Sequence, residues 1–250
     1  MKHLTLIGMG MGDPAFVTVQ AIAAMNMASV FFAFDKGEEK SELVAVRQAL
    51  CAKYIPHDNY RFVMIDNPVR DADGGYRAGV DAWHEARAER LRTAFAENVA
   101  ADGYGAFLVW GDPALYDSTL RVVRRAFGDT PADVEIEIIP GISSVQVLAA
   151  RHKIGLNEIG EPVHITTGRK LRDAGPIPGG VSIAVMLDGD LACRAHVGQG
   201  LTIYWGAALG SPDETLVAGP LDEVVGEIER ARADLKARRG WVMDTYLLRR

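Results

Sequence analysis

The sequence predicts an α/β protein made of two α/β domains, with a parallel-type sheet in the N-terminal domain and a mixed sheet in the C-terminal domain. In the first half, apolar strands alternate with helical stretches. In the second half, strands follow one another with fewer helices between them. Alternating strands and helices are typical of parallel sheets, whereas closely spaced strands favour mixed or antiparallel pairing.

The elements of the first half follow one another regularly. We expect strands at residues 4–7, 30–35, 61–65, 105–110 and 134–139, and helices near residues 14–28, 41–52, 80–101 and 119–127. Helix 80–101 carries Trp83, Leu91, Phe95 and Val99 at helical spacing, so we expect this face to lie in the core.

The pattern changes after the helix that starts at Ser143. We expect strands at residues 163–167, 181–187, 201–205, 215–218 and 241–248, and one clear helix at residues 221–238. We therefore place an N-terminal domain at residues 1–142 and a C-terminal domain at residues 143–250, and expect the two together to complete the ligand site.

Composition and charge argue against a nucleic-acid-binding protein and against a membrane-spanning one. The chain has 250 residues, of which 48% are hydrophobic and 24% charged, and its net charge is −6. No long basic run is present, which argues against nucleic acid as a partner. No apolar run approaches the ~18 residues that a membrane-spanning helix needs, so we expect no membrane segment.

The N-terminus and the cysteines predict a cytoplasmic protein. Met1-Lys2-His3-Leu4 leads straight into the first strand, so we expect no signal peptide. Cys51 and Cys193 are far apart and form no CxxC motif, which favours two buried thiols in a reducing compartment. The six histidines show no close ligand spacing, and we expect no metal.

Three glycine-containing turns each follow an apolar strand. The first turn is Gly8-Met9-Gly10-Met11-Gly12-Asp13-Pro14, the second is Trp110-Gly111-Asp112-Pro113, and the third is Pro140-Gly141-Ile142-Ser143-Ser144. Ligands of open α/β sheets bind in the crevice at the carboxyl ends of the strands. We therefore expect a ligand site built mainly from backbone loops.

The first turn alone is also compatible with a nicotinamide oxidoreductase or with a noncatalytic nucleotide-binding module. Asp35 ends the second strand, about where a ribose-binding carboxylate would fall. The spacing argues against the oxidoreductase, because the third glycine comes one residue earlier than in GxGxxG. Pro14 also removes an N–H that a phosphate could use.

Together, the three turns resemble those of the tetrapyrrole (corrin/porphyrin) methyltransferases, and the resemblance covers nearly the whole chain. The second turn continues as Gly111-Asp112-Pro113-Ala114-Leu115-Tyr116-Asp117-Ser118-Thr119, a stretch typical of the family. The resemblance implies two α/β domains with S-adenosyl-L-methionine in the cleft between them, S-adenosyl-L-homocysteine as its product, and a homodimer.

The resemblance also implies a set of cofactor-binding residues. They are Pro14, Trp110, Gly111, Asp112, Leu115, Ser143, Ser144, Met186, Leu187 and Ala208. Asp112 could instead cap the helix that follows Pro113, and the two serines could cap the helix that they begin. These two kinds of role are compatible.

Three further stretches resemble the branch of the family that methylates precorrin-5 at C-1 and releases its acetyl group as acetate. They are residues 34–40, 185–190 and 203–210. A sister enzyme acting at another ring position is the alternative. Releasing acetate requires a water molecule directed at a ketone, and so favours a general base.

We expect the catalytic residues to be Asp35, Asp112 and Tyr116, with Asp188 and Asp190 as further candidates for the base. A tetrapyrrole substrate carries several carboxylates, which arginine binds with matching fork geometry. From loop position alone, we expect arginines 61, 169, 172 and 194 to bind them.

Overall fold

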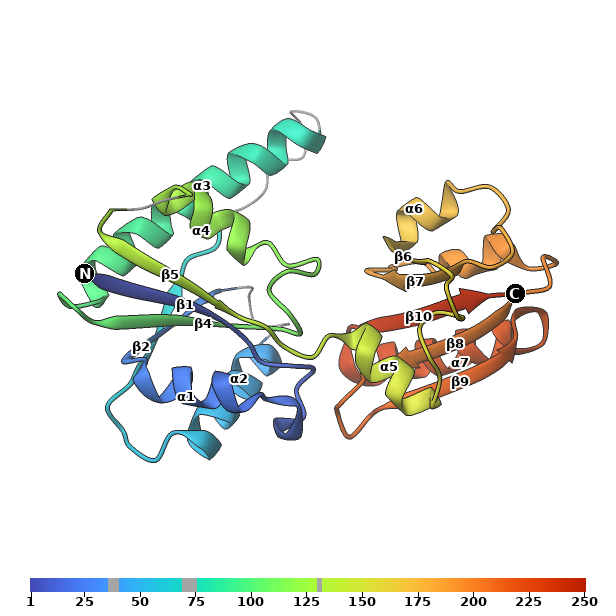
Figure 1. Ribbon diagram of the computed structural model, residues 1–250, viewed down its shortest axis with the longest axis horizontal. Helices are drawn as coiled ribbons and strands as arrows, with labels where there is room; N and C mark the ends of the chain where they lie inside the picture. The colour runs from blue at the N-terminus through green and yellow to red at the C-terminus, as the bar shows by residue number, and fades with distance from the viewer. Residues whose placement is uncertain (36–40, 69–75, 130–131) are drawn as a thin grey trace. The chain divides into compact units, whose positions relative to one another are not determined.

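The computed structural model describes residues 1–35, 41–68, 76–129 and 132–250. The chain divides into two compact units, Met1–Ile142 and Ser143–Arg250, and each unit contains one five-stranded sheet (Figure 1). Residues 36–40 belong to one of the stretches that resemble the acetate-releasing branch, and they lie outside the described residues.

The first unit has a fully parallel sheet with strand order β3-β2-β4-β1-β5. Its strands are β1 (Lys2–Gly8), β2 (Val30–Phe34), β3 (Arg61–Ile65), β4 (Tyr104–Val109) and β5 (Val134–Ile139). Most residues of β1 and all of β2 are buried. The predicted parallel-type sheet is confirmed.

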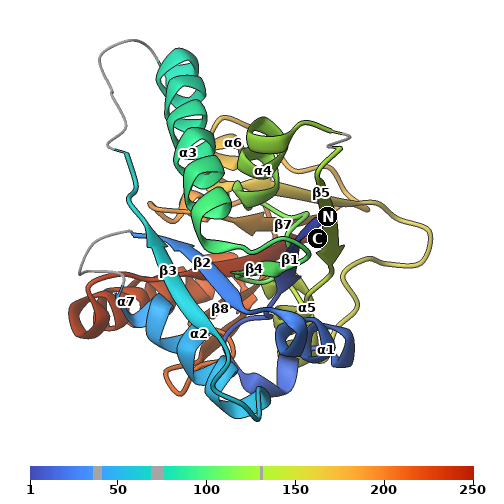
Figure 2. The ribbon, with the colours of Figure 1, turned by 90° about the vertical axis from the view of Figure 1, so that its left-hand side faces the viewer.

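Helices cover both faces of this sheet. They are α1 (Val19–Met27), α2 (Ser41–Tyr54), α3 (Tyr76–Asn98) and α4 (Thr119–Phe127). Figure 2 shows α1 and α2 on one face and α3 and α4 on the other. Two apolar clusters correspond to the two faces: Met25 and Leu50 belong to one, and Leu91 and Phe95 to the other.

The helix predicted at residues 14–28 is interrupted. Pro14–Phe16 forms one turn of 3-10 helix, and Val17 is extended. The Thr18 side chain then accepts a hydrogen bond from the backbone N–H of Ala21, so a new helix begins at Val19. Thr18 therefore divides the predicted helix, because threonine at an N-cap favours a helix start.

The second unit has a mixed sheet with strand order β6-β7-β10-β8-β9. Its strands are β6 (Val163–Thr167), β7 (Ser182–Met186), β8 (Thr202–Ala207), β9 (Thr215–Pro220) and β10 (Asp244–Arg249). β6 and β7 are parallel, whereas β10 pairs antiparallel with both β7 and β8. The predicted mixed sheet is confirmed.

The helices of the second unit are α5 (Ser144–His152), α6 (Gly168–Arg172) and α7 (Leu221–Arg239), together with a 3-10 turn at Ala192–His196. Neither α6 nor the 3-10 turn was predicted from the sequence, because each is too short to show a helical period. Trp205 and Tyr246 are fully buried in the core of this unit, and Leu221 and Ile228 of α7 pack against them.

The three turns meet inside the first unit because β1 lies between β4 and β5. Gly10 and Gly111 form an antiparallel bridge, in which the Gly111 N–H donates to the Gly10 carbonyl over 2.8 Å. A Cβ on Gly8 would lie 2.5 Å from the Gly141 nitrogen, and one on Gly141 would lie 2.1 Å from the Gly111 oxygen. The turns can approach this closely because these positions carry no side chain.

In the described part of the chain, no helix combines the length and apolar character that crossing a membrane requires.

The close contact between the turns predicts that a methyl group added at Gly141 destabilises the protein. Gly141→Ala places Cβ against backbone atoms, which cannot rotate away as a side chain could. We expect the free energy of unfolding in urea to fall by about 2–3 kcal/mol. Gly179→Ala is the matched control, because a Cβ there meets nothing within 4 Å. Equal unfolding midpoints for the two variants would contradict this account.

The two cysteines give a second prediction. Both are fully buried, and burial raises the pKa of each thiol to about 12. The reactive thiolate is therefore scarce at pH 8, and the native protein should not react with Ellman's reagent on the time scale of minutes. In guanidinium, both thiols should titrate at once, and Cys51→Ala should leave one. Rapid labelling of the native protein would show that these sites open.

Candidate functional site

Asp112 joins the second turn to the third. Its Oδ2 accepts a hydrogen bond from the Gly141 N–H at 2.8 Å, and its Oδ1 accepts one from the Ala114 N–H, also at 2.8 Å. Both carboxylate oxygens are therefore bound to backbone donors. The Ala114 contact closes a turn and caps no helix, because the helix expected directly after Pro113 is absent and α4 begins only at Thr119; that capping prediction was wrong. The Gly141 contact holds two turns in register.

The first turn is held by contacts with Trp110 and Tyr54. A Cβ on Gly12 would lie 3.0 Å from Cη2 of the Trp110 ring, so the indole lies against this turn. The Tyr54 hydroxyl donates to the Pro14 carbonyl at 2.7 Å and thereby fixes the turn to α2. The Trp110 Nε1–H is buried and has no acceptor among the described residues, although such donors are nearly always satisfied.

Leu115 and Tyr116 follow in the same loop. The Leu115 N–H donates to the Asp112 carbonyl at 3.2 Å, and its side chain is half-buried. Tyr116 has a φ of 53°, in the left-handed region that non-glycine residues seldom adopt, and is 43% exposed. Partial burial raises the pKa of its hydroxyl above the ordinary value.

Two residues of the second unit share this backbone strain. Leu187 follows β7 with a φ of 52°, and Ala208 follows β8 with a φ of 49°. Leu187 is also 64% exposed, although it is a large apolar residue. Strained backbone costs about 1–3 kcal/mol per residue and clusters at ligand sites, so both positions are candidate contacts. Met186, the last residue of β7, directly precedes Leu187 and is half-buried.

The two serines at the start of α5 have different partners. The Ser143 N–H and hydroxyl both donate to Oε1 of Gln146, at 2.8 and 2.9 Å, in a capping box. Ser144 is buried, and its hydroxyl accepts a hydrogen bond from the Thr245 hydroxyl at 2.8 Å, which ties α5 to β10. The capping role predicted for Ser143 is present, and Ser144 links two elements instead.

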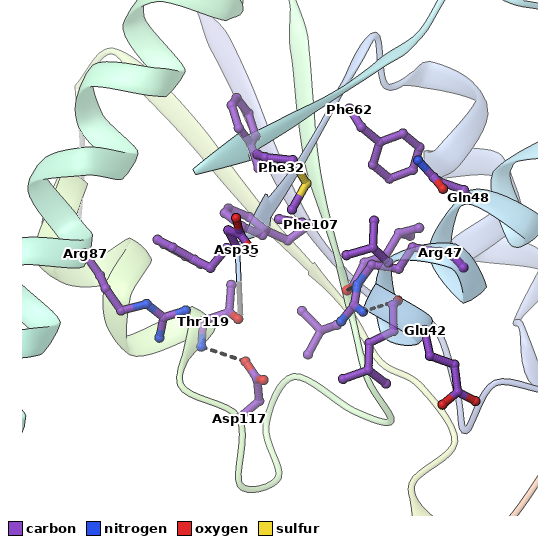
Figure 3. A pocket seen from close by; sticks show the side chains of 18 residues that line it. Phe32, Asp35, Glu42, Arg47, Gln48, Phe62, Arg87, Phe107, Asp117 and Thr119 are labelled. Atoms are coloured by element: carbon purple, nitrogen blue, oxygen red, sulfur yellow. Dashed lines mark hydrogen bonds between the residues drawn. The ribbon is translucent and has the colours of Figure 1, made fainter. Parts of the chain in front are cut away.

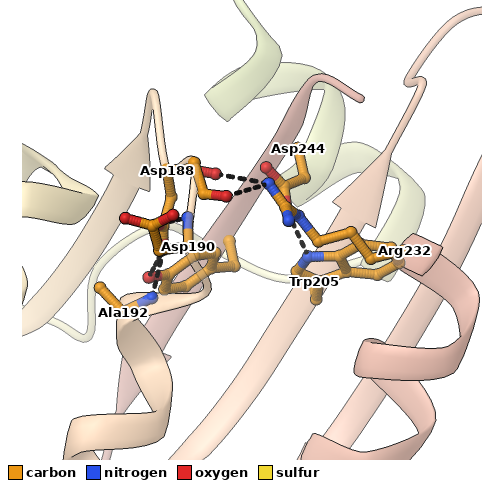
Figure 4. Close-up of polar contacts among 8 residues, drawn as sticks. Asp188, Asp190, Ala192, Trp205, Arg232 and Asp244 are labelled. Carbon is orange, nitrogen blue, oxygen red and sulfur yellow. Dashed lines mark hydrogen bonds and ion pairs between the residues drawn. The ribbon is translucent and has the colours of Figure 1, made fainter. Parts of the chain in front are cut away.

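Asp188 stands at the centre of a buried polar network (Figure 4). Its Oδ2 accepts from the Tyr246 hydroxyl at 2.6 Å and from the Ala192 N–H at 2.7 Å, and its Oδ1 accepts from the Asp190 N–H. With three donors bound, this carboxylate holds the turn that carries Leu187. It is therefore a poorer candidate for a general base than the sequence analysis allowed.

Arg232 extends the network. It donates through Nε to Oδ2 of Asp244 at 3.0 Å and through Nη2 to the Asp188 and Gly189 carbonyls at 2.9 Å. Burial raises the pKa of the Asp244 carboxyl, while the Arg232 charge opposes the shift. Asp190 is exposed and forms an ion pair with Arg172, so its carboxylate is also engaged.

A cavity of about 910 Å³ opens in the first unit at the carboxyl ends of β2 and β4 (Figure 3). Asp35, which directly follows β2, is exposed and lines this cavity, as does Asp117 from the loop after β4. Aliphatic side chains and four aromatic residues also line the wall; the aromatic residues are Phe32, Phe34, Phe62 and Phe107. The structure thus places Asp35 at a cavity and Asp112 in the junction between turns.

Two arginines that the sequence analysis did not select line the same cavity, Arg47 from α2 and Arg87 from α3. The arginines selected from loop position have other surroundings. Arg61 binds the side chain and carbonyl of Asn98, and Arg194 forms an ion pair with Glu229. Arginines inside helices gave no sequence signal, because most such residues lie on a solvated face.

Within the described ranges, no three His, Cys, Asp or Glu side chains are grouped as metal ligands. That the protein binds no metal stays a prediction.

Comparisons with known proteins agree on one family. The sequence profile of the Tetrapyrrole (Corrin/Porphyrin) Methylases matches residues 3–225. A curated precorrin-6A synthase [deacetylating] from Sinorhizobium sp is 43% identical over 251 residues, which covers 100% of this chain and 96% of that protein. These matches lend no support to a nicotinamide oxidoreductase.

Solved structures show the same fold. The crystal structure of CobF, a cobalamin synthesis related protein from Corynebacterium diphtheriae, has a TM-score of 0.85 and 36% identity, covering 100% of this chain and 98% of that one. Uroporphyrin-III C-methyltransferase from Thermus thermophilus, complexed with S-adenosylhomocysteine, has a TM-score of 0.58 and 18% identity, covering 99% and 97%. The chain belongs to the tetrapyrrole (corrin/porphyrin) methylase family.

Proposed function

We propose that this chain is an S-adenosyl-L-methionine-dependent C-methyltransferase of cobalamin biosynthesis that converts precorrin-5 to precorrin-6A. It would methylate C-1 and release the acetyl group as acetate. The observation that carries the proposal is the 43% identity, along the entire chain, to a precorrin-6A synthase [deacetylating]. A sister methyltransferase acting at another ring position is the second candidate, favoured by 30% identity over 139 residues to a precorrin-2 C(20)-methyltransferase.

The residues present fit the cofactor. The buried Trp110 Nε1–H has no acceptor among the described residues, so it is available to a ligand. The Trp110 ring lies against Gly12 of the first turn, where the absence of a side chain lets a ligand approach the backbone. Leu187 and Ala208 end strands of the second unit in strained conformations. Pro14, Gly111, Leu115, Ser143, Ser144 and Met186 complete the set that we propose to bind the cofactor. S-adenosylmethionine supplies an activated methyl group when bound.

The protein contributes to methyl transfer by holding the two reactants in the correct relative position. The displacement needs the acceptor carbon in line with the methyl group, and well-oriented reactants gain about 7–11 kcal/mol. Asp112 holds the second and third turns together through two backbone hydrogen bonds, and we propose that it acts by positioning this loop. Tyr116, strained and partly exposed four residues later, is proposed to contact the substrate.

Release of acetate is proposed to depend on Asp35, which is exposed at the cavity. The carboxylate would take a proton from water as the water oxygen adds to the ketone carbon. The bond between that carbon and the ring then breaks, acetic acid leaves, and the electron pair stays with the ring. A general base of this kind contributes about 10²–10⁴-fold to a rate.

The two units are proposed to act as two domains of one enzyme, residues 1–142 and 143–250, in a cytoplasmic homodimer. The family resemblance supports the dimer, and the compactness of each unit supports the division. Analytical ultracentrifugation tests the dimer directly.

Mass spectrometry tests the reaction. Pure enzyme is incubated with S-adenosylmethionine and precorrin-5 generated in situ. We expect a product that has gained one methyl group and lost one acetyl group, together with an equal amount of free acetate. Methyl gain without acetate would move the chain to another ring position. No turnover, and no rise in melting temperature with S-adenosylhomocysteine, would reject the methyltransferase proposal; NAD serves as the control ligand.

Asp35→Asn tests the proposed base. The amide keeps the size of the side chain but cannot take a proton, so acetate release should slow about 10²-fold or more. S-adenosylhomocysteine should still raise the melting temperature. Asp66→Asn is the matched control, because Asp66 is an exposed acid directly after β3 that pairs with Arg90 and does not line the cavity. Full acetate release by Asp35→Asn would show that Asp35 is not the base.

A further inference from the structure

The cavity of the first unit contains an unusual cation. Arg87 is 4% exposed and lines the cavity wall, where its guanidinium carbon lies 3.8 Å from the centre of the Phe34 ring and 4.5 Å from that of Trp83. Cation–π contacts of this kind compensate for part of the lost hydration. They do not neutralise the charge.

No described residue forms an ion pair with Arg87. Its Nη1 donates to the Ser118 hydroxyl at 3.0 Å, and its Nε is buried with no acceptor in the described part of the chain. Burial lowers the pKa of Arg87 to about 10, with the more distant Asp117 acting against the shift. Charged side chains are almost never fully buried unless they are paired, so this guanidinium lacks an anion.

Arg47 faces the same cavity under similar conditions. Its Nε donates to the Leu108 carbonyl at 2.8 Å and its Nη1 to the Leu43 carbonyl at 2.6 Å, and both of these acceptors are neutral. Burial lowers its pKa as well. Because α2 and α3 cover opposite faces of the sheet, the two arginines reach the cavity from both sides of the strand ends (Figures 2 and 3).

We propose that Arg87, assisted by Arg47, forms a subsite that binds a carboxylate of the substrate. This inference rests on the proposed function, since it identifies the ligand as a carboxylate carried by a tetrapyrrole. Arginine matches the planar geometry of a carboxylate and can bind it through two parallel hydrogen bonds. The phenylalanines of the wall then contact the apolar ring edge that carries the carboxylate.

The acids of the cavity make the subsite selective. Asp35, Glu42 and Asp117 also line it, and Oδ1 of Asp117 accepts the Thr119 N–H at 2.6 Å. These three negative charges repel a small free anion, which has no apolar surface to bury against the wall. A carboxylate on a large apolar ring gains that burial and overcomes the repulsion.

Binding of two corrins tests the subsite. Cobyrinic acid carries carboxylates around the corrin ring, and cobinamide carries amides in their place. Quenching of tryptophan fluorescence gives the Kd of each for the wild type and for Arg87→Met. We expect Arg87→Met to raise the Kd of cobyrinic acid about 10- to 100-fold, as expected for losing hydrogen bonds to a charged group. The Kd of cobinamide should not change.

Arg90→Met is the matched control, because Arg90 lies on the same helix, pairs with Asp66 and does not line the cavity. In the kinetic assay, Arg87→Met should raise the KM for precorrin-5 and largely keep kcat. Without ligand, its melting temperature should equal or exceed that of the wild type, because methionine removes a buried charge without an ion pair. A structural role for Arg87 would instead lower it.

Two results would overturn the subsite: no binding of cobyrinic acid to the wild type, or an equal Kd for the wild type and Arg87→Met. S-adenosylhomocysteine keeps the two proposals apart. If it raises the melting temperature of both proteins while the Kd values are equal, the subsite fails and the methyltransferase stands. If it has no effect on the wild type, the proposed function fails.

Discussion

The contact between the backbones of Gly8, Gly111 and Gly141 is the constraint on which the first unit's candidate site depends. It exists because β1 lies between β4 and β5, so that the turns after all three strands emerge at the same edge of the sheet. Asp112 then adds hydrogen bonds from the second turn to the third. The loops are thus held by backbone atoms and one carboxylate, which leaves the side chains of Trp110 and Tyr116 available for a ligand.

The second unit reaches a similar result by different means. Here the loop after β7 is fixed by buried side chains: Asp188 accepts from Tyr246, and Arg232 binds the carbonyls beside it. Such a network is rigid when every member has its partners. The rigidity explains how Leu187 can be kept both exposed and strained, since the residues around it determine its backbone conformation.

The fold could be predicted from the sequence more fully than the site. Strands that alternate with helices, as in the first half, give a strong periodic pattern in the sequence. The turns after β1, β4 and β5 could be located because each contains glycine. The division of helix 14–28 at Thr18 was missed, because one capping residue inside an apolar stretch gives little signal. Arg47 and Arg87 were missed for a different reason. These two arginines come together only at a cavity to which α2 and α3 contribute from opposite faces of the sheet. A local sequence pattern cannot predict such an arrangement, because the two helices are far apart in the chain.

The strand order of the first unit also determines when its sheet can form. β1 pairs with β4, which begins at Tyr104, and with β5, which begins at Val134. During synthesis, the apolar side chains of Leu4, Leu6 and Ile7 therefore leave the ribosome long before either neighbouring strand exists. Pairings between distant segments form slowly and leave hydrophobic strands exposed in the meantime. The strand that carries the first glycine turn therefore stays unpaired in the nascent chain for a long time, and is a natural segment for a chaperone to cover.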